Sequence, residues 1–183
     1  GIYASNVNVG VSVSDNAATG VVSGIRSVSY KVTSLGQQTQ TGDLYTYTAT
    51  AGSLNDLTKS VSRNFTVDAG LNNSNDVQIE VTAVDNAGNV YKTTNVIKID
   101  ITAPTIEVSY DNNSGDTTFG DDTYFKESRT ATVKVTERNF DPAKVIPVIE
   151  ASAGGVPSIS GWTTVGGSGN GDDTVNIATI YYG

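Results

Sequence analysis

One run of the sequence, from Val77 to Val108, constrains the fold more than any other. Apolar residues alternate with polar ones over Val77–Ala83, which is the period-two pattern of a strand with one buried face. The next residues, Asp85–Asn89, favour a turn, because Gly88 and the asparagines tolerate positive φ. A second extended segment, Val90–Ile101, follows. The run therefore predicts two antiparallel strands joined by a tight turn.

The same run predicts a domain boundary. Ala103-Pro104 interrupts the extended segment, because proline lacks the N–H that a β-ladder needs. The alternation of apolar and polar residues then restarts over Ile106–Tyr110. We therefore expect one domain over residues 1–102 and a second over residues 103–183. The linker between them, Thr102–Thr105, is too short to behave as a free coil, so we expect it to restrict bending.

The rest of the chain favours an all-β fold. Short alternating segments are separated by residues typical of turns, which is the pattern of a Greek-key sandwich. We expect further strands at residues 7–13, 28–32, 45–47, 61–67, 131–135, 145–149 and 175–182. Residues 33–42 are expected to form a polar connection, and Asn139–Ala143 a single helical turn with Pro142 at its first position. Trp162, the one tryptophan, is expected in the core.

Composition excludes several classes of function. The net charge of −8 argues against a nucleic-acid partner, which needs a basic face. No stretch is apolar enough for membrane insertion, and the first residues do not form a signal peptide, so any targeting segment is expected outside this sequence. The absence of histidine and cysteine removes the usual general base, nucleophile and thiolate ligands. The paired acids Asp121-Asp122 and Asp172-Asp173 lie in glycine-rich loops, so we expect no enzyme and no required cofactor.

Three stretches carry a resemblance to a known family. They are D-N-A-G-N (85–89) followed by I-D-I-T-A-P-T (99–105), VSVSDNAATGVVSGIRSVSYKV (11–32) and YFKESRTATVKVTERNFDPAKV (124–145). With them, nearly the whole chain resembles the tandem bacterial immunoglobulin-like (Big-type) repeats of large Gram-positive surface proteins and adhesins. The resemblance implies two tandem immunoglobulin-like Greek-key β-sandwich domains. The second ends at Tyr181-Tyr182-Gly183 without a D-x-A-G-N hairpin, so we expect it to lack its last strands and to leave an apolar edge there.

The resemblance also implies a function and a location. It indicates a non-catalytic spacer or stalk in an extracellular protein of the bacterial cell surface, with neighbouring immunoglobulin-like repeats of the parent chain as partners. Two alternatives stay open at this point. The chain is a ligand-binding adhesin module whose loops hold a host glycan or protein, or it is a filament subunit that self-associates by strand complementation through its incomplete second domain.

Structural calcium is the most specific hypothesis for a bound ion. Hard cations take clustered oxygen ligands from carboxylates, amides and carbonyls. In related repeats, aspartates at domain junctions can bind calcium and stiffen the stalk. The candidate ligands, which we expect to converge near the domain junction, are Asp85, Asn86 and Asn89 of the turn, Asp100 near the linker, and Asp15 with Asn16 from an opposing loop. The alternative also stays open, in which these residues form turns and Asp100 is a solvated charge.

An intramolecular isopeptide bond is a further hypothesis for a surface stalk. Lys31, Lys98 and Lys134 lie on expected strands, but no lysine–acid–asparagine pattern surrounds them. We therefore expect solvated strand lysines, of which at least two face outward between apolar neighbours.

Overall fold

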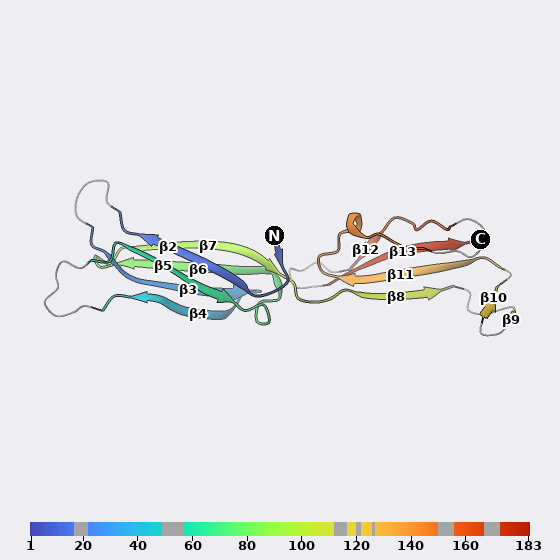
Figure 1. Ribbon diagram of the computed structural model, residues 1–183, viewed down its shortest axis with the longest axis horizontal. Helices are drawn as coiled ribbons and strands as arrows, with labels where there is room; N and C mark the ends of the chain where they lie inside the picture. The colour runs from blue at the N-terminus through green and yellow to red at the C-terminus, as the bar shows by residue number, and fades with distance from the viewer. Residues whose placement is uncertain are drawn as a thin grey trace. The chain divides into compact units, whose positions relative to one another are not determined.

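The computed structural model describes residues 1–16, 22–48, 57–111, 117–119, 122–125, 127–149, 156–166 and 173–183. These residues form β-strands and one short 3-10 helix, so the fold is all-β, as predicted (Figure 1). The chain divides into two compact units, Gly1–Ile101 and Thr102–Gly183, which we call unit 1 and unit 2. Among the described residues, no helix is both long enough and apolar enough to cross a membrane.

Unit 1 contains two sheets. The larger has the strand order β1–β7–β6–β3–β4, and the smaller pairs β2 with β5. Every neighbouring pair is antiparallel except β1 and β7, which run parallel. The strands are β1 (Ile2–Tyr3), β2 (Val7–Ser14), β3 (Ile25–Ser34), β4 (Gln37–Thr46), β5 (Ser60–Val67), β6 (Ser74–Asp85) and β7 (Val90–Ile99).

The core of unit 1 lies between these two sheets. Alternate residues of each strand point inward, so both sheets contribute side chains to one apolar cluster, as in a β-sandwich. Tyr30 of β3 stacks on Phe65 of β5 with ring centroids 3.9 Å apart, which joins the two sheets directly. The buried apolar residues are Val11, Ile25, Val28, Val32, Val61, Phe65, Val67, Ala69, Val77, Ile79 and Ile99.

A fully buried asparagine fixes the loop between β5 and β6. The side chain of Asn72 donates hydrogen bonds to the Gln40 side chain (2.9 Å) and to the carbonyl of Asp68 (2.7 Å), and it accepts one from Thr39. The loop is thereby linked to β4 of the larger sheet. Each polar group of this amide has a partner, which offsets the cost of removing it from water.

Unit 2 contains one four-stranded antiparallel sheet among its described residues, with the order β12–β13–β11–β8, and a separate hairpin of β9 and β10. Its buried apolar residues lie in the two central strands: Ala131, Val135, Ala178 and Ile180. The elements are β8 (Thr105–Tyr110), β9 (Thr117–Phe119), β10 (Asp122–Tyr124), β11 (Arg129–Glu137), the 3-10 helix Pro142–Lys144, β12 (Thr163–Val165) and β13 (Thr174–Tyr182).

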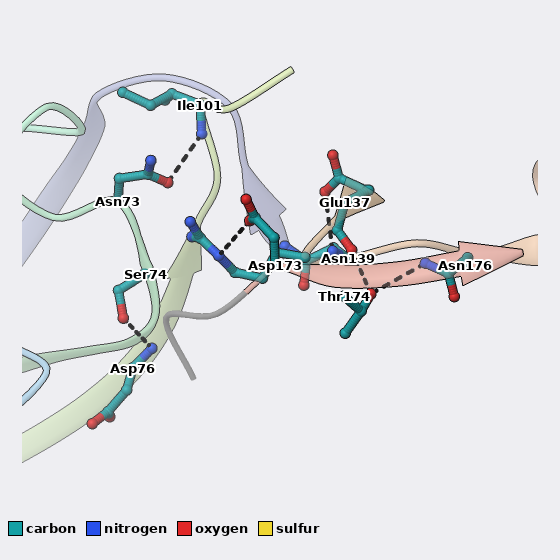
Figure 2. Close-up of polar contacts among 10 residues, drawn as sticks. Asn73, Ser74, Asp76, Ile101, Glu137, Asn139, Asp173, Thr174 and Asn176 are labelled. Atoms are coloured by element: carbon teal, nitrogen blue, oxygen red, sulfur yellow. Dashed lines mark hydrogen bonds and ion pairs between the residues drawn. The ribbon is translucent and has the colours of Figure 1, made fainter. Parts of the chain in front are cut away.

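Polar contacts within unit 2 hold the start of β13. Figure 2 shows Thr174, whose hydroxyl donates to the carbonyl of Glu137 and accepts from the side chain of Asn176. The carbonyl of Asn176 accepts a hydrogen bond from Thr164 at 2.7 Å, so this buried amide joins β13 to β12. Trp162 is half-buried and packs edge-on against Phe140, so the prediction of a core position is confirmed in part.

The structure corrects three predicted features. The polar connection over residues 33–42 is a tight turn at Leu35-Gly36, both with positive φ, followed by β4. The expected strand at residues 45–47 overlaps only the end of β4, and the rest of this edge strand was missed because its Thr and Gln residues show no apolar alternation. The strand expected over residues 145–149 is absent, and its apolar side chains Ile146 and Val148 are exposed. The predicted helical turn is confirmed, with Asp141 as N-cap and Pro142 at its start.

The third correction concerns the last strand. We expected a free apolar edge at Tyr181, and the structure bears this out in part: β13 pairs with β11 from Thr174 to Tyr182, but on its other side the described partners reach only Val175–Ile177 and Ile180. Among the described residues the edge strands of this sheet are β12 and β8, and β8 pairs with β11 alone. The position of an edge strand depends on long-range pairing, which the sequence pattern of one strand does not specify.

Candidate functional site

The turn between β6 and β7 is held by a carboxylate. Asp85 accepts hydrogen bonds from the backbone N–H and from the side-chain amide of Asn89, both at 2.7 Å. The N–H of Gly88 donates to the carbonyl of Asp85, and Gly88 has a φ of 92°, which favours glycine. The side-chain hydrogen bond from Asn89 is the main reason that the pKa of Asp85 lies below its ordinary value, against a smaller opposing effect of burial.

A second aspartate lies at the same end of unit 1. Asp15 follows β2, and its carboxylate accepts a hydrogen bond from the N–H of Gly24 at 2.7 Å. Asn86 donates to the carbonyls of Gly24 and Ser23, both at 2.9 Å. The structure therefore brings together four of the predicted calcium ligands, namely Asp15, Asp85, Asn86 and Asn89. Asn16 lies next to Asp15 and is exposed.

Asp100 does not lie with this group. The ten-residue strand β7 runs between Asn89 and Asp100, a length of about 33 Å. The N–H of Asp100 donates to the carbonyl of Tyr3 at 2.8 Å, at the other end of the strand. The next residue, Ile101, donates its N–H to the side chain of Asn73, as Figure 2 shows. The expected convergence of Asp100 with the turn is therefore wrong.

The hydrogen bonds of the grouped residues support the alternative in which they form turns, since the carboxylates of Asp15 and Asp85 both accept hydrogen bonds from backbone N–H groups. Within the described parts of the chain, no three acidic, histidine or cysteine side chains are placed to share a metal ion. Calcium at this end of unit 1 stays a hypothesis.

The strand lysines point outward, as predicted. Lys31 and Lys92 flank Glu80 on the outer face of the larger sheet, at 3.6 and 3.4 Å. Burial raises the pKa of Glu80, but the hydrogen bond from Lys92 and the charge of Lys31 outweigh it, so the pKa lies below its ordinary value. Lys134 pairs with Glu107 at 3.0 Å, and both side chains are exposed. Lys98 is also exposed.

Unit 1 has an open groove that sequence reasoning missed. It has a volume of about 850 Å³ and lies between β2 of the smaller sheet and β7 of the larger sheet. Valines of β2 and apolar residues of β6 contribute to its lining, and polar residues lie along both β2 and β7 and at the end that carries Asp15 and Asp85. The apolar lining residues include Val7, Val9, Val11, Val13, Ile79, Val81, Ala83 and Ile97.

The groove exists because the inward face of β7 is buried only near the end of the strand, at Ile97 and Ile99. Its inward side chains are those of Tyr91, Thr93, Asn95, Ile97 and Ile99, since Ile97 pairs with inward Val77. Ile99 is fully buried and Ile97 half-buried, whereas the other three are exposed. A signal for this change was present in the sequence: the inward face is apolar at Ile97 and Ile99 and mostly polar before them.

Comparison with known proteins assigns no family. The sequence matches no protein-family model, and no curated protein is similar enough to it to count as a match.

Proposed function

We propose that the chain is a non-catalytic spacer in a bacterial surface or secreted protein, in which unit 1 bears tension along the polypeptide. The observation that carries this proposal is the parallel pairing of β1 with β7. Residues Ile2 and Tyr3 pair with Lys98 and Ile99, and the N–H of Asp100 adds a hydrogen bond to Tyr3. The first and the last strands of unit 1 are therefore bonded to each other.

This pairing has a mechanical consequence. Tension enters unit 1 through Gly1, ahead of β1, and leaves through Ile101, after β7. Because the two strands run parallel, the tension pulls them in opposite directions along their length, and their hydrogen bonds are loaded together. Strands that are instead pulled apart from one end lose their hydrogen bonds one at a time. Shear of this kind supports a role in bearing load.

The architecture of unit 1 supports an immunoglobulin-like assignment. Its order β1–β7–β6–β3–β4, facing the pair β2–β5, supports a Greek-key sandwich, because β2 and β5 pair in the second sheet while β3 and β4 lie in the first. Such domains occur as tandem repeats in surface proteins, so we propose neighbouring repeats as the partners of this chain. The fold alone does not specify a function, and the strand pairing supplies the further argument.

Single-molecule stretching across unit 1 tests the proposal. The chain has no cysteine, so handles attached through Gly1→Cys and Ile101→Cys are specific. We expect Tyr3→Pro to lower the unfolding force, because proline removes a backbone N–H from β1. Tyr3→Ala is the matched control, since it removes the side chain and keeps the backbone donor. Equal unfolding forces for the two variants would contradict a load-bearing role for this pairing.

A second function has one observation in its favour. The free edge strand β8 exposes Ile106 and Val108, at 67% and 54%, and an exposed apolar edge invites strand addition. This favours the filament subunit that assembles by strand complementation, with β8 in place of Tyr181 as the contact. Light scattering during size-exclusion chromatography tests it. Oligomers of the unmodified chain that become monomers in the Val108→Lys variant would support assembly. A monomer over a wide concentration range would exclude it.

A further inference from the structure

The walls of the groove in unit 1 carry unused backbone groups as well as apolar side chains. In the part of unit 1 that the structure describes, β2 pairs with β5 alone, and β7 pairs with β6 on one side and with β1 at Lys98 and Ile99 on the other. Among the described residues, no strand pairs with the outer side of β7 from Val90 to Ile97. Alternate N–H and C=O groups of that stretch therefore face away from β6. Such an edge accepts a further strand.

The existing pairing fixes the direction of that strand. Ile2 pairs with Lys98 and Tyr3 with Ile99, in parallel. A strand that continues this ladder along β7 is parallel to β7 and leads into Gly1, which lies opposite Ile97 when the register is extended by one residue. The ladder of β1 is already an interface with β7, and the groove is its direct continuation.

The same pairing fixes which side chains enter the groove. Tyr3 lines the groove and Ile2 does not, so residues of this ladder point inward at every second position. Counting back from Gly1, the second, fourth and sixth positions of the added strand lie opposite Asn95, Thr93 and Tyr91, the inward residues of β7. Apolar side chains at these positions cover the valines that line the groove, and a shift by one residue turns them outward.

Charge at one end of the groove gives a further preference. Asp85 and Asp15 line the groove beside the start of β7. Because the added strand is parallel to β7, its first residue lies at this acidic end. A lysine or arginine there is favoured by the two carboxylates.

We propose that the groove of unit 1 receives an extended strand from the linker of a neighbouring repeat, parallel to β7 and in line with β1. The strand carries apolar residues at every second position and a basic residue at its start. This inference rests on the proposed spacer function, because it assigns the occupant to a neighbouring repeat. The added strand lengthens the sheared pairing from two residues to the full length of β7.

Hydrogen exchange on an extended chain tests the inference. A segment of about eight residues is fused ahead of Gly1, with lysine at its start, valine at the second, fourth and sixth positions before Gly1, and threonine elsewhere. The matched control has the same composition with the valines at the first, third and fifth positions. We expect the first segment to slow amide exchange over Val90–Ile97 about tenfold or more relative to the control. Equal exchange in the two chains would overturn the inference.

Two substitutions on β7 separate groove binding from a general effect. Thr93 faces the groove and Thr94 faces the opposite side of the sheet, and both are exposed, so aspartate at either is compatible with folding. We expect Thr93→Asp to abolish the protection, because a bound strand covers its carboxylate, and Thr94→Asp to retain it. Equal loss in both variants would count against an occupied groove. Exchange does not depend on force, so its failure is distinguishable from failure of the stretching experiment on Tyr3.

Discussion

Unit 1 and unit 2 differ in how their sheets are covered. In unit 1 a second sheet, β2 with β5, lies against the larger one, and valine, isoleucine and phenylalanine side chains from both are buried between them. In the described part of unit 2 one sheet stands without a second one, and burial is confined to its central strands β11 and β13.

The difference is clearest at equivalent positions of edge strands. Val11 on β2 is 8% exposed, because it faces another sheet, whereas Val108 on β8 is 54% exposed. Both belong to alternating runs of similar apolar content. Alternation therefore identifies the face of a strand that can be buried, and the presence of an opposing sheet decides whether it is buried. The stability of the two units should differ accordingly.

The largest expected effect comes from the core of unit 1. Phe65→Ala removes a buried ring that stacks on Tyr30, so we expect a loss of about 3–5 kcal/mol in the free energy of unfolding of unit 1. In unit 2, Ile106→Ala should cost less than about 1 kcal/mol, because Ile106 is mostly exposed. Urea unfolding followed by circular dichroism measures both, and Trp162 fluorescence follows unit 2. Similar losses of unfolding free energy in the two variants would contradict the difference in burial between unit 1 and unit 2.

An intermediate effect is expected from the buried asparagines. Asn72→Ala leaves the Gln40 side chain and the Asp68 carbonyl without their partner, which costs about 1–3 kcal/mol. Asn176→Ala removes contacts to two threonines only, so its cost should lie at the lower end of that range. Asn64→Ala, at an exposed position of β5, is the control. A larger loss for Asn176 than for Asn72 would reverse the expected order.

The smallest effect is expected at the β6–β7 turn. The pKa of Asp85 lies below its ordinary value of 3.8, so its hydrogen bonds stabilise unit 1 above that pH and are lost as the pH falls through the lowered value. Asp85→Ala should lower the melting temperature slightly at neutral pH and flatten its decline below about pH 4. Asn89→Ala should reproduce both changes in part, because it removes the side-chain donor and keeps the backbone N–H of residue 89. Melting curves between neutral and acidic pH decide this.

The sequence predicted the strands that alternate, and it missed features that depend on pairing. Val7 to Val13 and Val77 to Ala83 were assigned correctly because one face of each strand is apolar. Most of β4 was missed because an edge strand rich in Thr and Gln needs no apolar face. Residues 145–149 were assigned wrongly because the run is rich in Val and Ile, although no described strand pairs with it.

The candidate site was predicted in part for the same reason. The turn residues Asp85, Asn86 and Asn89 are close in the sequence, and their local hydrogen bonds follow from turn chemistry. Asp15 joins them through Gly24, a contact that depends on the packing of β2 against the larger sheet. Asp100 was misplaced because a ten-residue strand separates it from the turn. The groove was missed because it is defined by unpaired strand edges.

Stretching the whole chain between its ends tests the central claim, that unit 1 bears load through β1 and β7, most directly. Two unfolding events are expected, distinguished by the extended lengths of residues 102–183, up to about 295 Å, and residues 1–101, up to about 360 Å. We predict that the shorter event occurs first, at the lower force, because the described part of unit 2 buries fewer apolar side chains than unit 1 does. If the longer event came first, or if both occurred at one force, unit 1 would not be the load-bearing element.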